Sequence, residues 1–365
     1  MNDELHCLLA LTRLPGLGLR GASLLYQQAG SAAALFRYKD RLEQLIPDIS
    51  PRAVTAFASA DEALRRAEAE LAFADAHHIR CLTPDSPEWP VRLHHCDDAP
   101  LILFYRGTAD LNARHILCVV GTRRCTDYGK ALCREFLTEL QRAVPRLLVV
   151  SGLAYGIDIH AHRAALGCGL PTVGVLAHGL DRLYPAMHRQ TACDMLAQGG
   201  LLTEFMSGTV PDKGNFVRRN RIVAGMSDAC LVVESADKGG ALITAGIAQS
   251  YGRDVFAVPG RVGDPSSAGC NALIRKSVAG LVECGMDVAE AMGWATAAQP
   301  VQRELFPDLS PVEERVVRAL GGSDGKSVNQ LVVETDLPVQ ELLSQLFELE
   351  MRGIVRSLSG GLYRV

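Results

Sequence analysis

The sequence lacks the features that mark several common protein classes. Its 11 cysteines form no CxxC pair, which excludes a zinc ribbon and a dithiol redox motif. Scattered cysteines in odd number are typical of reduced thiols, and we therefore expect a cytoplasmic protein. The chain has no run of about 18 apolar residues, and its acidic start carries no positively charged segment. We therefore expect neither a membrane span nor a signal peptide.

The sequence also has no excess of basic residues. The net charge is −4 and the isoelectric point lies near 6.2, so the chain as a whole is no general nucleic-acid binder. A nucleic-acid site would have to be a local basic patch. A chain of 365 residues, 48% of them hydrophobic, is long enough for two or three domains with a sizeable core.

The middle of the chain alternates short apolar runs with helical patterns. Continuous apolar runs between helices predict a parallel sheet that is covered on both faces. Ligands of such sheets bind beyond the carboxyl ends of the strands. The expected strands are Ile116–Val120, Leu147–Val150, Thr172–Leu176, Leu201–Thr203, Ala229–Val233 and Val255–Val258.

Two smaller units are expected on either side of this sheet, which we place in residues 76–294. Residues 1–75 read as helical, and Leu14–Gly18 forms a tight turn between two helices. This turn fits a plain helical hairpin, which we favour, or a helix-hairpin-helix whose N–H groups seat a DNA phosphate. Residues 295–308 have the composition of a linker. In residues 309–365, three helices and a terminal hairpin predict a winged helix.

The stretch Ile116–Lys130 combines a buried strand, a glycine turn and a helix. Gly121 ends the strand, and Thr122, Arg123 and Arg124 follow it. Unpaired N–H groups at such a helix start favour a phosphate, and the arginines add charge. Because a single glycine precedes the helix, the stretch is neither GxGxxG nor a Walker A loop. It fits a phosphate seat or an ordinary turn with surface arginines.

The segment Lys213–Arg221 is basic and contains no acid. Its cations are Lys213, Arg218, Arg219 and Arg221. Phe216 and Asn220 lie four residues apart, so on a helix they share a face. A phenyl ring can stack on an unpaired base while cations hold the backbone. The alternative is a solvated basic helix with Phe216 in the core.

Two further glycine-rich segments open helices near the same sheet edge. Lys238–Ala245 contains Gly239 and Gly240, and Ser151–Gly156 follows a predicted strand. Each is a candidate anion seat, because the N–H groups at a helix start lack partners. Three such segments on one sheet edge indicate an anion site more strongly than any one of them.

Asp158, His160 and His162 suggest metal ligands at first sight. On a helix, only Asp158 and His162 share a face, and no second cluster of ligands completes a site. We therefore expect no metal, and a structural hydrogen bond between Asp158 and His162.

Taken in order, the motifs resemble the bacterial DNA-processing protein A family, DprA or Smf. The likeness is strong over roughly residues 85–285, and the flanking units agree in layout. Thr122 stands where serine is commoner, and Ser277–Val278 replaces a common Gly-Ala pair. The matching segments are Val120–Arg123, Ser151–Asp158 with Ala161–His162, Gly179–Pro185, Phe216 with Arg219–Ile222, Gly239–Ala245, Pro259–Gly260 and Ser267–Ile274.

This resemblance implies an α/β fold and a function. The fold is an extended Rossmann-like parallel sheet with helices on both faces. It is preceded by a small SAM-like or helix-hairpin-helix-like domain and followed by a winged helix. The implied function is that of a homodimeric mediator without cofactor, which protects incoming single-stranded DNA in natural transformation and helps load RecA onto it. The implied DNA-binding residues are Gly121, Thr122, Arg123, Lys213, Phe216, Arg219, Asn220, Arg221, Gly239 and Gly240.

Parts of the sequence are also compatible with two other functions. Related Rossmann-like folds cleave nucleotide N-glycosidic bonds, but this requires a carboxylate beside a phosphate loop, and no Glu follows Gly239–Thr244 within a helix turn. A transcription regulator would read duplex DNA through the winged helix, whose third helix is acidic. We therefore expect a binding protein rather than an enzyme.

Overall fold

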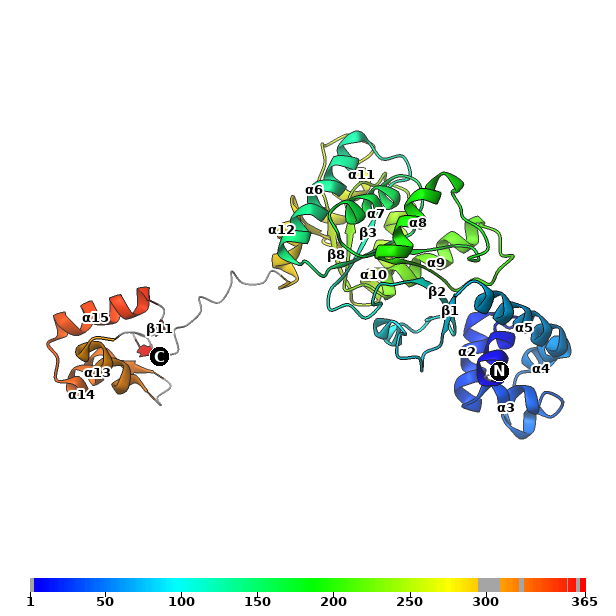
Figure 1. Ribbon diagram of the computed structural model, residues 1–365, viewed down its shortest axis with the longest axis horizontal. Helices are drawn as coiled ribbons and strands as arrows, with labels where there is room; N and C mark the ends of the chain where they lie inside the picture. Colours follow the sequence, from blue (N-terminus) through cyan, green and yellow to red (C-terminus); the bar gives the residue numbers. More distant parts are fainter. Residues whose placement is uncertain (1–2, 295–308, 322–324, 353, 359–361) are drawn as a thin grey trace. The chain divides into compact units, whose positions relative to one another are not determined.

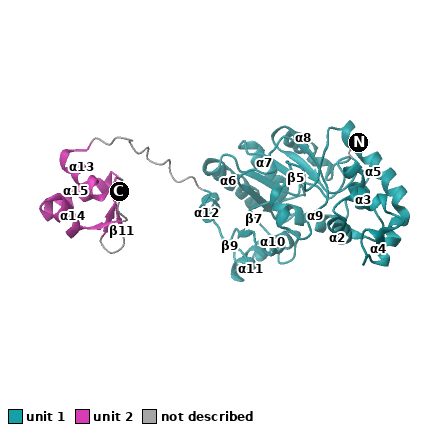
Figure 2. Cartoon of the chain, turned by 90° about the horizontal axis from the view of Figure 1, so that it is seen from below, with its two compact units in different colours: residues 1–296 teal, residues 297–365 magenta. Residues whose placement is uncertain are grey.

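The computed structural model (Figure 1) describes residues 3–294, 309–321, 325–352, 354–358 and 362–365. The chain separates into two compact units, Met1–Thr296 and Ala297–Val365 (Figure 2). The predicted linker, residues 295–308, and the tip of the terminal hairpin lie outside the described residues. The predicted boundary between residues 75 and 76 falls within the first unit and stays a prediction.

The first unit is built on a sheet of nine strands in the order β1-β2-β6-β5-β4-β3-β7-β8-β9. The seven strands β3 to β9 run parallel to one another, whereas β1 and β2 add an antiparallel edge beside β6. The strands are β1 (Arg80–Leu82), β2 (Leu103–Gly107), β3 (Ile116–Val120), β4 (Leu148–Ser151), β5 (Thr172–Val175), β6 (Gly200–Thr203), β7 (Ala229–Val232), β8 (Asp254–Ala257) and β9 (Gly280–Leu281).

The centre of this sheet is a topological switch point. From β3 the chain adds β4, β5 and β6 on one side, and then β7, β8 and β9 on the other. Since β3 and β7 are parallel, hydrogen-bonded neighbours, their carboxyl ends open side by side. In open α/β sheets this crevice is where ligands bind.

Both faces of the sheet are buried, which explains the unbroken apolar runs. In β3, Leu117 and Val119 enter one core, whereas Ile116, Cys118 and Val120 enter the other. The first core lies under α6 (Asp127–Ala143), α7 (Ile157–Gly167) and α12 (Gly285–Ala291), and the second under α9 (Lys213–Gly225), α10 (Gly240–Ser250) and α11 (Ala268–Arg275). Figure 2 shows α6 and α7 on one side of the sheet and α10 and α11 on the other. The predicted parallel sheet with helices on both faces is confirmed.

A cluster of five helices precedes the sheet, as the sequence predicted. Its apolar core continues onto Leu101, Ile102 and Phe104 at the start of β2. Among the described residues, no helix is long and apolar enough to cross a membrane. The helices are α1 (Asp3–Leu11), α2 (Gly18–Ala29), α3 (Ala32–Arg37), α4 (Pro51–Ala56) and α5 (Ala60–Ala76).

A buried carboxylate joins this helical region to the sheet. Glu70 of α5 is 2% exposed and accepts hydrogen bonds from the backbone N–H of Ser207, at 2.8 Å, and from its hydroxyl. The guanidinium of Arg66 donates to the same carboxylate at 2.8 Å and to the carbonyl of Ser207. This network fixes α5 against the segment that follows β6.

The second unit is the predicted winged helix. Helix α13 (Pro311–Leu320), α14 (Val328–Thr335) and α15 (Val339–Met351) enclose a small core around Leu331, Leu342 and Leu346. Strands β11 (Arg356–Leu358) and β12 (Leu362–Arg364) pair antiparallel, and β10 (Lys326–Ser327) pairs with β12 on its other side.

The expected hydrogen bond between Asp158 and His162 is wrong. His162 is fully buried, and its Nδ1 lies 2.7 Å from the hydroxyl of Thr172 on β5. Asp158 instead faces the loop after β4. Although the two residues share a helix face, β5 lies close enough to supply another partner. Within the described residues, no three His, Cys, Asp or Glu side chains are grouped to hold a metal ion.

We expect Glu70→Ala to lower the free energy of unfolding of the first unit. The substitution leaves the N–H of Ser207 and the Arg66 guanidinium without their buried acceptor, which costs about 1–3 kcal/mol. Urea denaturation measures the effect. The matched control is Glu68→Ala, an exposed position of the same helix, which should change stability by less than about 0.5 kcal/mol. Equal effects of the two variants would contradict a stabilising role of the Glu70 hydrogen-bond network.

The buried His162 should make the fold sensitive to acid. Burial lowers the pKa of His162 to about 3, far below its ordinary value of 6.5. Between pH 6.5 and 3, His162 is therefore protonated in the unfolded chain but remains neutral in the folded chain. This difference lowers the free energy of unfolding as pH falls from 6.5 toward 3. The loss approaches about 1.4 kcal/mol per pH unit. His162→Gln should flatten the dependence of the unfolding free energy between pH 7 and 5, and parallel profiles would contradict this.

Candidate functional site

A cavity of about 730 Å³ opens beyond the carboxyl ends of β3, β4 and β7. Its walls come from the loops after these strands, from Tyr184 in the segment after β5, and from the first turns of α9 and α10. The cavity therefore lies at the topological switch point, where parallel sheets bind their ligands.

Nine of the ten predicted site residues line this cavity, although they come from three separate segments of the chain. The tenth, Arg221, does not. The residues brought together are Gly121, Thr122, Arg123, Lys213, Phe216, Arg219, Asn220, Gly239 and Gly240.

Arg221 lies on another side of α9. Its guanidinium donates to the carboxylate of Glu204 and to the carbonyl of Asp98, each at 2.5 Å, and the residue is 7% exposed. Two residues along a helix turn the side chain by about 200°, so Arg219 and Arg221 cannot face the same cavity. Arg221, which the resemblance implies as a DNA-binding residue, therefore lies apart from the other nine.

The loop after β3 is held by the two loops beside it. The N–H of Thr122 donates to the carbonyl of Glu234 at 2.7 Å, and the carbonyl of Thr122 accepts from the N–H of Ile157 at 3.1 Å. Gly156 has a φ of +78°, and a Cβ there would lie 2.0 Å from the carbonyl oxygen of Thr122. Only glycine at this position lets the loops after β3 and β4 approach so closely.

Glu234 is a positioning residue that the sequence placed at a strand end but that is absent from the predicted site residues. It is 3% exposed, and its carboxylate accepts from the backbone N–H of Thr126 at 2.9 Å and from its hydroxyl at 2.5 Å. The same hydroxyl accepts from the N–H of Gly129 and so caps α6. Glu234 therefore holds both ends of the loop that carries Arg123. The signal in the sequence was its place directly after a strand.

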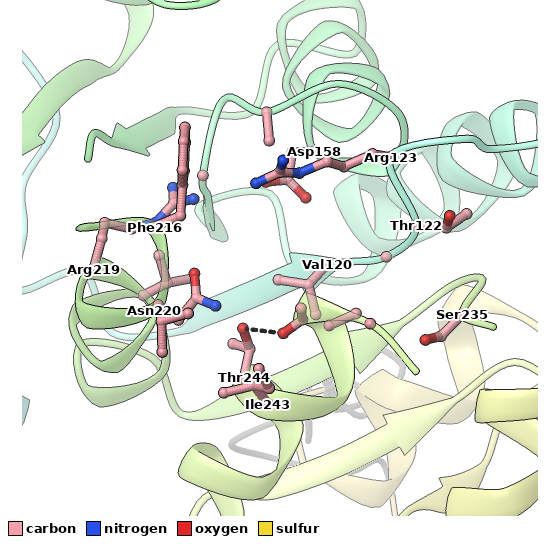
Figure 3. A pocket seen from close by; sticks show the side chains of 18 of the residues that line it. Val120, Thr122, Arg123, Asp158, Phe216, Arg219, Asn220, Ser235, Ile243 and Thr244 are labelled. Carbon is pink, nitrogen blue, oxygen red and sulfur yellow. Dashed lines mark hydrogen bonds between the residues drawn. The ribbon is translucent and has the colours of Figure 1, made fainter. Parts of the chain in front are cut away.

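Arg123 and Phe216 meet inside the cavity (Figure 3). The guanidinium carbon of Arg123 lies 4.8 Å from the centroid of the Phe216 ring, a cation–π contact. The Tyr184 ring, which sequence reasoning did not predict here, lies 5.9 Å from Phe216. Phe216 is half-buried and lines the cavity, so it lies outside the apolar cores described above.

Cations outnumber carboxylates along the cavity wall. The cations are Arg123, Arg124, Lys213, Arg219 and Lys238, and the carboxylates are Asp158 and Asp212. Asp212 caps α9 by accepting from the N–H of Asn215 at 2.9 Å. A positive field in a concave site raises the local concentration of anions.

Arg219 and Asp158 form the buried floor of the cavity. Arg219 is 3% exposed, and it donates to the carbonyl of Val175 at 2.5 Å. Burial raises the pKa of Asp158, and the nearby charge of Arg219 opposes that shift. Burial likewise lowers the pKa of Arg219, with the charge of Asp158 opposing. Arg219 contributes positive charge to the cavity, because a guanidinium stays charged in proteins. Since the residue is buried, it shapes the cavity wall more than it offers direct contact to a ligand.

The first turn of α10 offers backbone donors to the cavity. Its N-cap residue, Gly239, makes no side-chain cap, whereas Thr126 caps α6 and Asp212 caps α9. A Cβ at Gly240 would meet nothing within 4 Å, so a ligand can reach the backbone there. Uncapped N–H groups beside Lys238 suit a phosphate.

Comparison with known proteins agrees with this geometry. The sequence profile of DNA recombination-mediator protein A matches residues 80–293, and that of the DprA winged helix domain matches residues 298–361. Protein Smf of Escherichia coli K12 is 36% identical over 298 residues, which cover 79% of this chain and 78% of Smf.

Two solved structures extend the comparison. DNA processing protein A from Streptococcus pneumoniae superposes with a TM-score of 0.65 at 31% identity, over 80% of this chain and 97% of that one. The same protein from Helicobacter pylori, whose structure concerns a single-stranded DNA binding mode, gives a TM-score of 0.53 at 27% identity, over 59% and 96%. The profile match, the long alignment and the shared fold together show that this chain belongs to the DNA recombination-mediator protein A family, DprA or Smf.

Proposed function

We propose that this protein binds single-stranded DNA in the cavity beyond β3, β4 and β7. The observation that carries the proposal is the Arg123 guanidinium packed on the Phe216 ring, inside a cavity whose cations outnumber its carboxylates. Unpaired bases stack on aromatic rings while cations hold the phosphates, a combination that suits a single strand better than a duplex. The single-strand binding mode of the Helicobacter relative supports the proposal.

The predicted site residues would contact different parts of the strand, according to their chemistry. Arg123 and Lys213 contact phosphates, and the N–H groups at Gly239 and Gly240 seat another. Phe216 offers a ring edge and face to a base. The remaining predicted residues, Gly121, Thr122, Arg219 and Asn220, shape the wall or reach a base edge, and Arg221 braces α9 through Glu204.

The biological role that fits this site is that of a recombination mediator in the cytoplasm. Such a protein protects incoming single strands in natural transformation and helps load RecA, and we propose that it acts as a homodimer. Of the described cavity residues, only Asp158 and Asp212 are carboxylates, the first buried and the second engaged as a helix cap. This supports a binding protein over an N-glycosidase. Release of free base from nucleoside monophosphates would overturn that choice.

The winged helix has a surface that suits a protein better than DNA. Its third helix, α15, exposes Glu341 and Glu348, which a duplex would repel. The same helix exposes the apolar side chains of Leu343, Phe347 and Met351. We therefore propose a protein-contact or auxiliary role for residues 309–365.

Arg123→Ala should weaken single-strand binding and make it less dependent on salt. Each phosphate neutralised on a single strand contributes about −0.7 to the slope of log K against log salt, and one such contact is lost. Fluorescence titration of an oligothymidylate across a salt series measures both quantities. Arg142→Ala, an exposed position on α6 away from the cavity, is the matched control and should leave both unchanged. Wild-type affinity and slope in the Arg123 variant would remove this residue from the site.

A chain that ends at Gln299 should bind single strands about as tightly as the full chain. The reason is the charge of α15, whose carboxylates cannot assist a phosphodiester chain. Binding titrations on both proteins test this, with the oligomeric state checked by sedimentation. Loss of binding in a folded truncated chain of unchanged oligomeric state would show that the winged helix takes part.

A further inference from the structure

A row of aromatic rings continues beyond the cavity. From Phe216, the Tyr184 ring follows at 5.9 Å between centroids, the Tyr155 ring at a further 6.5 Å, and the His188 ring at 5.3 Å from Tyr155. Tyr184 lies in the cavity wall, whereas Tyr155 lies outside it. The two tyrosines are 42% and 40% exposed. Large rings left this open to water form a surface that a ligand can cover.

Both tyrosines are held in place by buried histidines. The Tyr184 N–H donates to Nε2 of His178 at 3.2 Å, and Nδ1 of that ring lies 2.9 Å from the carbonyl of Gly179. His188 lies 3.0 Å through Nδ1 from the carbonyl of Leu153, and its ring packs against Tyr155. Burial lowers the pKa of both histidines, so they support the tyrosines as neutral rings. His178 thus fixes the backbone at Tyr184, and the His188 ring supports the Tyr155 ring, so both residues lose less conformational entropy when a base stacks on them.

A cation accompanies the two tyrosines. Arg163 of α7 is exposed, and its Nε donates to the hydroxyl of Thr191 at 3.2 Å. Thr191 follows His188 by three residues, so this bond holds Arg163 to the segment that carries the ring packed against Tyr155. The side of α9 that faces away from the cavity is less favourable to a nucleic acid, because its Arg218 and Arg221 are already paired with Glu204.

We propose that the DNA strand held in the cavity leaves it over Tyr184 and Tyr155, which stack on successive unpaired bases. Arg163 neutralises a phosphate of this emerging segment. The proposal rests on the proposed function and adds to it a direction for the strand and a binding subsite outside the cavity. Interleaved aromatic rings and cations are how single-strand-binding proteins follow a strand without reading its sequence.

The test compares two lengths of oligothymidylate, because a short strand should fill the cavity and a long one should also cover the tyrosines. Suitable lengths are about 4 and about 16 nucleotides, the limits of site size in single-strand-binding folds. Wild-type protein should gain affinity with length. In full-length Tyr155→Ala the long strand should bind about fivefold or more weakly, with the short strand nearly unchanged. The double variant with Tyr184→Ala should lose more.

Three control variants separate stacking from other effects. Tyr155→Phe keeps the ring face and should bind the long strand like the wild type. Tyr155→Leu keeps apolar bulk without a ring, so it should lose the long-strand affinity while retaining the wild-type melting temperature. Phe216→Ala lies within the cavity and should weaken both lengths.

The outcomes are distinct. If the Tyr155 variants bind both lengths like the wild type while Phe216→Ala weakens both, the proposed exit path is wrong and the cavity remains the site. If Phe216→Ala and Arg123→Ala also leave both lengths unaffected, the proposed function fails as well. A loss for Tyr155→Ala that Tyr155→Phe fails to restore would also overturn stacking.

Discussion

The site depends on the contact between the ends of β3 and β7. Glu234, the second residue after β7, accepts from Thr122 with its carbonyl and from Thr126 with its carboxylate. One buried residue therefore fixes the loop after β3 at both ends and the start of α6. Gly129 belongs to the same constraint, because a Cβ there would lie 2.3 Å from the Glu234 carboxylate. Without this clamp, Arg123 would extend from a mobile loop and lose entropy on meeting a ligand.

The clamp also explains how charge and apolar surface meet in one cavity. Arg123 leaves its loop toward α9, where the Phe216 ring accepts its guanidinium face. Arginine is suited to this place because its planar group stacks on rings and still offers donors to a phosphate. Below it, Asp158 and Arg219 are both buried, and the charge of each opposes the effect of burial on the pKa of the other. The result is a preorganised, positively charged surface in a chain whose net charge is negative.

The two units of the chain divide along chemical lines. The sheet unit gathers cations at one edge, whereas α15 of the winged helix carries carboxylates and exposed apolar side chains such as Phe347. A winged helix is commonly a reader of duplex DNA, but a fold does not determine a function. Surface chemistry decides what a module binds, and the carboxylates and apolar side chains of α15 are the basis of the protein-contact role proposed above.

The sequence alone predicted the sheet and most of the residues that line the candidate site. A strand buried on both faces must be apolar throughout, so Ile116–Val120 could be assigned to the residue, whereas β9 is too short and too exposed to leave a pattern. Tertiary structure decided the rest, because long-range contacts leave no local signal. Glu234 and Tyr184 lie at the site although they are far from Arg123 in the sequence. Arg221 lies outside the cavity, because the helix turns its side chain to another face, where it pairs with Glu204. Residue type shows which chemistry is available, and packing alone determines which groups can meet.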